Sequence, residues 1–138
     1  MKNYLFLFLL FNHLSHFCQY YDLEVNIKNI QEIKGFIQIG LYNNAKEFPK
    51  VNKEYQRFYF KVTDNKMTYT IKNLKQGNYA IATYHDVNSD KICNRNIIGY
   101  PTEDFGFSNN VKLFLAPPTF SSALIELNNN KSIEIALD

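Results

Sequence analysis

The segment that starts at Asp86 carries oxygen donors at the spacing of a calcium-binding loop. The donors at relative positions 1, 3, 5, 7 and 9 are Asp86, Asn88, Asp90, the main-chain carbonyl of Ile92, and Asn94. Calcium takes about six to eight oxygen ligands and is held by such loops at these positions. The spacing therefore predicts a metal site formed by these five residues, with calcium as the cofactor.

Two positions depart from the usual calcium loop. Lys91 stands at position 6, where glycine normally provides a positive φ, and Ile97 stands at position 12, where a bidentate glutamate is usual. With so few carboxylates we expect weak affinity, about 10⁻⁴ to 10⁻³ M. A second interpretation needs no metal, because Asp and Asn side chains also accept bonds from nearby main-chain amides and hold surface turns. The sequence leaves both interpretations open.

Aromatic residues lie on both sides of this segment. They are Tyr84 and His85 before it, and Tyr100, Phe105 and Phe107 after it. Long ordered loops in small domains either serve a function or are held down by their own side chains. The aromatic residues therefore predict either a ligand-binding patch or packing of the loop onto the domain.

An enzymatic interpretation would make His85 a base and Asp86 the group that orients it. Adjacent residues of a strand point to opposite faces, so these two side chains do not pair easily. The sequence also contains no recognisable serine or cysteine nucleophile motif. We therefore expect a protein that is not an enzyme.

Alternating apolar and polar residues predict the strands that position these groups. Such segments include 22–28, 35–42, 58–62, 67–71, 78–85, 123–127 and 132–137. About seven strands without a long helical period predict an all-β fold, a single antiparallel β-sandwich that is immunoglobulin-like or transthyretin-like. Residues 128–131 predict a hairpin between the last two strands, and residues 86–110 a long loop.

The spacing Leu74-x-x-Gly77-x-Tyr79 matches the corner where a sandwich chain crosses between sheets. In such corners a tyrosine hydroxyl bonds back to the main chain. Tyr79 is therefore expected to be structural.

The N-terminus has the features of a secretory signal. Lys2 precedes the apolar run 4–11, which is too short to span a bilayer. We expect residues 1–18 to be a signal peptide and residues 19–138 a secreted domain, periplasmic or extracellular, without a membrane span. A lipoprotein signal at Cys18 is disfavoured, because Phe17 stands where a small residue is required.

Composition excludes several classes of protein. The chain has 138 residues, 46% hydrophobic and 16% aromatic, which suits one packed domain. The net charge of +2 argues against a nucleic-acid-binding protein, and two cysteines argue against a disulfide scaffold. We expect a monomer.

The strings Tyr84-His85-Asp86-x-Asn88-x-Asp90, Gly99-x-Pro101 and 106–110 (Gly-Phe-Ser-Asn-Asn) resemble the DUF2141 family of exported bacterial proteins. The resemblance extends over nearly the whole of 19–138 and implies an envelope or secreted sandwich domain. It implies no particular activity.

Together these features predict a secreted, non-catalytic β-sandwich that acts as an envelope or extracellular interaction module and carries a weak calcium-binding loop. Its partner would be an unidentified protein or glycan. The alternative is a small-molecule or glycan carrier that uses the aromatic residues around His85 and Phe105.

Overall fold

A computed structural model describes residues 18–138. Their regular structure is all β apart from one short 3₁₀ turn, which confirms the predicted all-β class. The elements are β1 (Tyr20–Lys28), β2 (Phe36–Tyr42), β3 (Gln56–Lys61), β4 (Met67–Lys75), β5 (Gly77–Asp86), β6 (Phe105–Phe107), η1 (Ser108–Asn110), β7 (Ile125–Leu127) and β8 (Lys131–Ala136). The predicted signal peptide lies outside these residues except for Cys18. Within residues 18–138, no helix has the length and hydrophobicity needed to cross a membrane.

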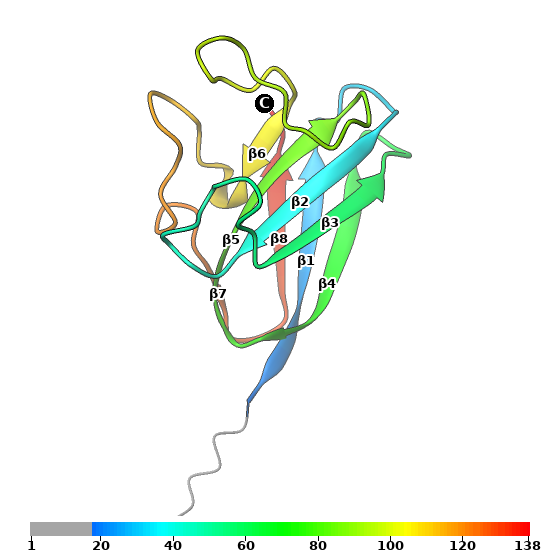
Figure 1. Ribbon diagram of the computed structural model, residues 1–138. Coiled ribbons are helices and arrows are strands. Elements are labelled where there is room, and N and C mark those ends of the chain that lie inside the picture. Colours follow the sequence, from blue (N-terminus) through cyan, green and yellow to red (C-terminus); the bar gives the residue numbers. More distant parts are fainter. Residues whose placement is uncertain (1–17) are drawn as a thin grey trace, which may run out of the picture.

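The strands form two sheets that pack in a sandwich-like arrangement (Figure 1). The smaller sheet has the order β4-β1-β8, and the larger has the order β3-β2-β5-β6, with β7 also paired to β5. One pair departs from the antiparallel expectation, because β1 and β8 run parallel. The sequence-based prediction of about seven strands also missed β6, which lies within the segment 86–110 that we expected to be a loop.

The predicted C-terminal hairpin is wrong. β7 pairs with β5 in the larger sheet, whereas β8 pairs with β1 in the smaller one. The connection 128–130 therefore crosses between the sheets. The register of β8 explains this placement, because Ile133 and Ile135 lie beside Val25 and Ile27 of β1 and extend the same apolar face.

The main core lies between the two sheets. β1 alternates buried Leu23, Val25 and Ile27 with partly exposed polar residues, as the period-two pattern predicts. From the larger sheet, alternate residues of β2 and β5 enter the same core, including Ile39 and Ile81. Burial of these apolar side chains is the main stabilising term for the fold.

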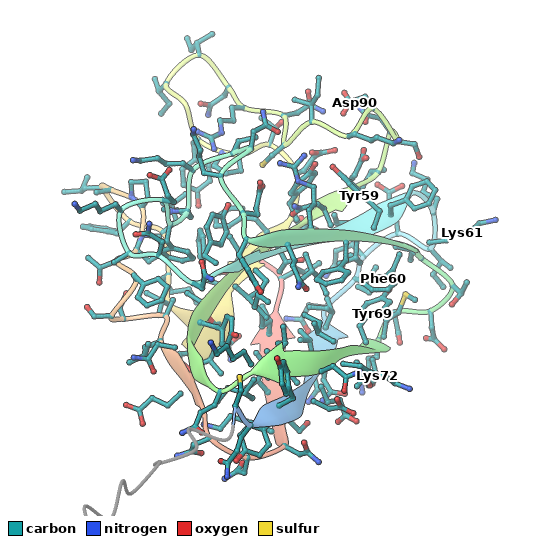
Figure 2. All side chains as sticks on the ribbon, turned by 60° about the horizontal axis from the view of Figure 1, so that its bottom comes forward. Tyr59, Phe60, Lys61, Tyr69, Lys72 and Asp90 are labelled. Carbon is teal, nitrogen blue, oxygen red and sulfur yellow. The ribbon has the colours of Figure 1, made fainter. Side chains whose placement is uncertain are left out.

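Contacts between the two sheets close the sandwich along both of its edges. Phe60 of β3 stacks on Tyr69 of β4 with ring centroids 3.8 Å apart, while Tyr59 lies on the other face of β3 (Figure 2). On the opposite side, main-chain bonds join Phe105 and Asp138 in both directions. A Cβ at Gly106 would lie 2.7 Å from Cγ2 of Ile135, so β6 can approach β8 this closely only with glycine there.

The predicted tyrosine corner is present. The Tyr79 hydroxyl donates to the Lys75 carbonyl oxygen at 2.7 Å, where the chain passes from β4 in one sheet to β5 in the other. The structural role expected for Tyr79 is confirmed.

Candidate functional site

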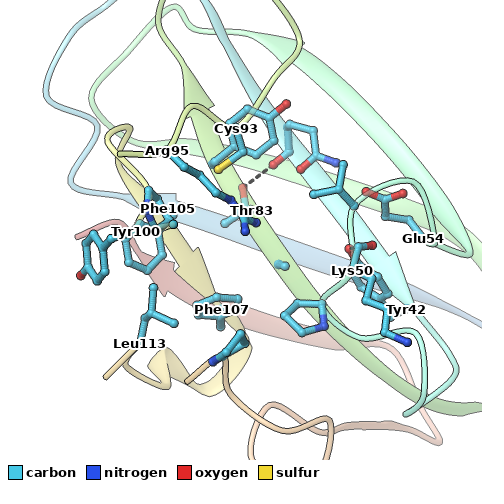
Figure 3. A pocket seen from close by; sticks show the side chains of 18 of the residues that line it. Tyr42, Lys50, Glu54, Thr83, Cys93, Arg95, Tyr100, Phe105, Phe107 and Leu113 are labelled. Carbon is cyan, nitrogen blue, oxygen red and sulfur yellow. Dashed lines mark hydrogen bonds between the residues drawn. The ribbon is translucent and has the colours of Figure 1, made fainter. Parts of the chain in front are cut away.

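A pocket of about 770 Å³ lies on the outer face of the larger sheet, away from the core between the sheets (Figure 3). Three long connections surround it: 43–55 between β2 and β3, 87–104 between β5 and β6, and 111–124 between η1 and β7. In Figure 1, 43–55 and 111–124 lie at the left of the molecule and 87–104 lies at its top. The volume falls in the usual range for small-molecule sites, about 300–1,000 Å³.

A small residue, Ala82 of β5, lines the pocket floor and leaves room above the sheet. Its partner in β2 is Gly40. The Glu54 side chain covers Gly40, where an added Cβ would lie 2.9 Å from Glu54 Cγ. Glu54 also pairs with Arg57 at 2.5 Å, and this pair anchors the connection 43–55 over β2 and β3.

A chain of edge-to-face aromatic contacts forms one wall. The centroid distances are 5.7 Å for Tyr100–Phe105, 5.9 Å for Phe105–Phe107, 6.1 Å for Phe107–Phe48 and 5.2 Å for Phe48–Tyr42. These contacts link Phe105 and Phe107 of β6 to the connections 87–104 and 43–55. Edge-to-face pairs add to the stabilisation that burial provides, so the wall is pre-formed.

The Ser-Asn-Asn string after β6 holds this wall in place. Buried Ser108 donates to the Ala123 carbonyl and accepts the Ile81 amide at 3.0 Å. Asn109, with φ of 61°, donates to the Leu124 carbonyl at 3.0 Å. Asn110 accepts the Ala136 amide at 2.8 Å and so caps the edge of β8. These side chains tie β6 to both sheets and to the connection 111–124.

The pocket lining also contains polar groups. Arg95 extends into the pocket near Cys93 and Thr83 in Figure 3. Burial raises the pKa of the Cys93 thiol above its ordinary value, and nearby Arg95 opposes that shift. Burial, with the neighbouring Tyr59 hydroxyl, also raises the pKa of the Tyr84 phenol. Both groups are therefore neutral near pH 7.

The predicted calcium loop is held by its own hydrogen bonds. Asp86 is fully buried, and its two oxygens accept the amides of Asp90 at 3.1 Å and Lys91 at 2.9 Å. Asp90 in turn accepts the Asn94 side-chain amide at 3.1 Å, and bonds from Asn94 and the Ile92 amide lower the pKa of its carboxyl.

Lys91 has φ of 63°, so position 6 of this loop does adopt the conformation that glycine usually provides. Among residues 18–138, no group of three or more His, Cys, Asp or Glu side chains is arranged to hold a metal ion. The loop thus has the turn geometry that the sequence suggested, and calcium binding stays a prediction.

His85 is also fully buried and does not line the pocket. Its Nε2 lies 2.8 Å from the Lys34 carbonyl oxygen, while Asp86 bonds to the loop amides, so the two side chains are not paired. Of the five predicted ligand residues, the structure therefore brings four into one pocket: Tyr84, Tyr100, Phe105 and Phe107. Phe105 and Phe107 also pack the loop, so both interpretations of these aromatic residues apply to them.

Several lining residues were not singled out from the sequence. They include Gln38, Tyr42, Tyr59, Lys50, Arg95, Leu113 and Phe114. A signal for some of them exists, because the outward positions of the strands carry tyrosine, glycine and alanine instead of the charged residues typical of a solvent-exposed face. The residues on the connections carry no such periodic signal.

The sequence profile of one family matches residues 25–135, most of the chain, and its description reads "Uncharacterized protein conserved in bacteria (DUF2141)". The chain therefore belongs to the DUF2141 family, as the motifs around Asp86 and Gly106 indicated. No curated protein and no solved structure matches it.

Proposed function

We propose that this protein is a non-catalytic binding domain that holds a small organic molecule in the pocket on the outer face of the β3-β2-β5-β6 sheet. The observation that carries the proposal is the pocket itself, which joins a floor at the small residue Ala82 to a pre-formed aromatic wall. Concave sites with an apolar lining and a few polar groups are the usual form of small-molecule sites.

The geometry thus favours the carrier function over the interaction module that the sequence favours. An interaction module would use a flat or protruding surface, whereas the predicted aromatic residues line a cavity. His85 supports a non-catalytic role, because its ring is buried against the Lys34 carbonyl and away from the pocket.

Export belongs to the same proposal. Residues 1–18 have the charge and the short apolar run of a signal peptide, so the domain would meet its ligand in the periplasm or outside the cell. An immunoglobulin-like or transthyretin-like topology and a monomeric state stay predictions.

The test is the binding of N-phenylnaphthylamine, an uncharged aromatic dye whose fluorescence rises in apolar sites. Ala82→Trp places a large side chain on the pocket floor, and Thr70→Trp places the same side chain on an exposed position of β4 as a matched control. We expect the dye to bind the wild type and Thr70→Trp with equal affinity. Ala82→Trp should bind it at least about tenfold more weakly while keeping a cooperative thermal transition. Equal binding by all three proteins, or by none, would refute the proposal.

Calcium binding is tested separately by thermal unfolding with about 10 mM calcium and with chelator. At about 100 times its dissociation constant, a ligand stabilises the folded state by about 2.7 kcal/mol. A calcium-specific rise in Tm that Asp86→Ala abolishes would establish the site. An unchanged Tm would assign Asp86 and Asp90 to the turn alone.

A further inference from the structure

Three cations around the pocket have no acidic partner. The lining includes Lys50, Lys91 and Arg95 in addition to Arg57, which is already paired with Glu54. Among residues 18–138, no carboxylate lies within ion-pair distance of these three side chains. Lys91 lies 6.0 Å from the centre of the Tyr59 ring, at the polar side of the pocket. An excess of positive charge in a concave site attracts an anion.

Exposed apolar side chains also line the pocket. Ile98 lies on one connection, and Phe114 and Leu115 lie on another; their exposed fractions are 82%, 83% and 91%. All three line the pocket together with Tyr100, Phe105 and Phe107. Contiguous apolar surface of this kind on a monomer marks a site that something apolar covers.

The two ends therefore differ in character. Figure 3 shows Arg95 beside Cys93 and Thr83, with Phe107 and Leu113 on the lower side of the pocket and Tyr100 at its edge. A ligand that matches both ends needs an anionic group at one end and a flexible apolar body at the other. Its apolar body must also extend past the aromatic wall to cover the mouth.

We infer that the pocket takes a single-chain anionic amphiphile, a hydrocarbon chain that ends in a carboxylate or phosphate. This inference rests on the proposed function and specifies its ligand class. The head group would face Arg95 and Lys91, and the chain would lie along Phe105 and Phe107 and out between Ile98 and Phe114. Guanidinium groups bind carboxylate and phosphate through paired N–H donors, so Arg95 is the main head-group contact.

The head-group claim is tested by displacing N-phenylnaphthylamine from the purified protein with ligands that share one chain, all below their micelle concentrations. Dodecanoate and dodecyl phosphate carry an anion, dodecanol is uncharged, and dodecyltrimethylammonium is a cation. We expect at least one of the two anions to bind roughly tenfold more tightly than the alcohol, and the cation to bind most weakly. The tighter of the two anions identifies the head group.

The residue assignment uses Arg95→Gln with Lys72→Gln as the matched control. Lys72 is an exposed cation on β4, away from the pocket (Figure 2). Arg95→Gln should remove most of the advantage of the anion over dodecanol and leave the affinity for dodecanol unchanged. Lys72→Gln should leave both affinities unchanged. Equal losses in the two variants would contradict a specific head-group site.

The chain claim uses the exposed apolar residues of the mouth. The double variant Phe114→Ser/Leu115→Ser should weaken dodecanoate several-fold and leave hexanoate unaffected, because only the longer chain reaches the mouth. Ile33→Ser, at a similarly exposed position in the connection between β1 and β2, is the control and should change neither. These exposed substitutions leave the core intact.

The outcomes separate the two proposals. Binding of the neutral dye together with equal affinities for dodecanoate, dodecyl phosphate and dodecanol would overturn the anionic class and leave the small-molecule pocket standing. Failure of the dye and of every dodecyl ligand to bind would overturn both.

Discussion

The two faces of the β3-β2-β5-β6 sheet are built by the same strands and do different work. On the inner face, Ile39 and Ile81 are fully buried in the core between the sheets. On the outer face, the neighbouring position Ala82 lies on the floor of a pocket that three connections surround. A strand with period-two alternation can thus provide stability from one face and a binding site from the other.

The two faces of the sheet also differ in the structure that covers them. The inner face is covered by another sheet, so its partners are regular and close-packed. The outer face is covered by connections that are held down by a few anchors, chiefly Phe48, Glu54 and the Ser108–Asn110 string. Substitutions on the inner face of the sheet should therefore change the free energy of unfolding, and substitutions on the outer face should change ligand affinity.

The largest loss of stability is expected from a substitution of Gly35, which lies where the start of β2 meets the end of β5. Gly35 has φ of 68°, and an added Cβ would lie 2.1 Å from the Asp86 carbonyl oxygen. Gly35→Ala therefore forces the end of β5 away from the start of β2, and we expect a loss of more than about 3 kcal/mol in the free energy of unfolding. Urea denaturation measures it.

Gly99 provides the control for this glycine. Its φ of 83° is also positive, but nothing lies within 4 Å of an added Cβ. Gly99→Ala should cost only the conformational strain, about 1 kcal/mol. Equal losses for the two variants would mean that steric contact with Asp86 is not the cause.

The next prediction compares the faces directly. Ile81→Ala removes a fully buried inner side chain and should lower the free energy of unfolding by about 2–5 kcal/mol without changing dye affinity in the folded protein. Leu113→Ala, a partly buried residue of the pocket, should cost under about 1.5 kcal/mol and weaken the dye several-fold. If Leu113→Ala destabilises as much as Ile81→Ala, the pocket wall is part of the core and the distinction fails.

A smaller effect is expected at the loop that borders the pocket. Asp86→Ala leaves the Lys91 amide without its acceptor and the Asp90 amide with Asn88 Oδ1 alone, and it should cost about 1–3 kcal/mol without calcium. Asn88→Ala removes one exposed acceptor and should cost about 1 kcal/mol or less. Thermal unfolding in chelator measures both, and a harmless Asp86→Ala would show that the turn is held by other contacts.

The smallest effect is expected in the alkylation rate of Cys93, and this rate also reports whether the pocket is occupied. Because burial raises the pKa of the Cys93 thiol, its thiolate fraction at pH 8 is lower than that of an ordinary cysteine. Alkylation by iodoacetamide in a Cys18→Ser background should be slower than for a free thiol and should accelerate as pH rises past 9. Bound dodecanoate should slow it further, since Cys93 lines the pocket. A rate that the ligand does not change would place the ligand elsewhere.

The inner face could be predicted from the sequence and the outer face only in part. Leu23, Val25 and Ile27 alternate with polar residues, and this local pattern determines which side of β1 is buried. By contrast, β6 consists of three residues, Phe-Gly-Phe, which is too short for a period to be visible.

The partner of β8 also could not be predicted, because a parallel pairing with β1 depends on residues about a hundred positions away. The pocket could not be predicted for the same reason, because it forms between residues that are distant in the sequence. Tyr84, Phe105 and Phe107 were identified by type, but Lys50 and Arg95 join them only because two separate connections fold over the sheet.

The most direct test of the two-face account is an amide chemical-shift titration of the protein with N-phenylnaphthylamine. We expect the perturbed amides to lie around 82–84, 98–101, 105–107 and 113–117, with little change in β1 and β4. Perturbations concentrated in the β4-β1-β8 sheet, or none at saturating dye, would contradict it.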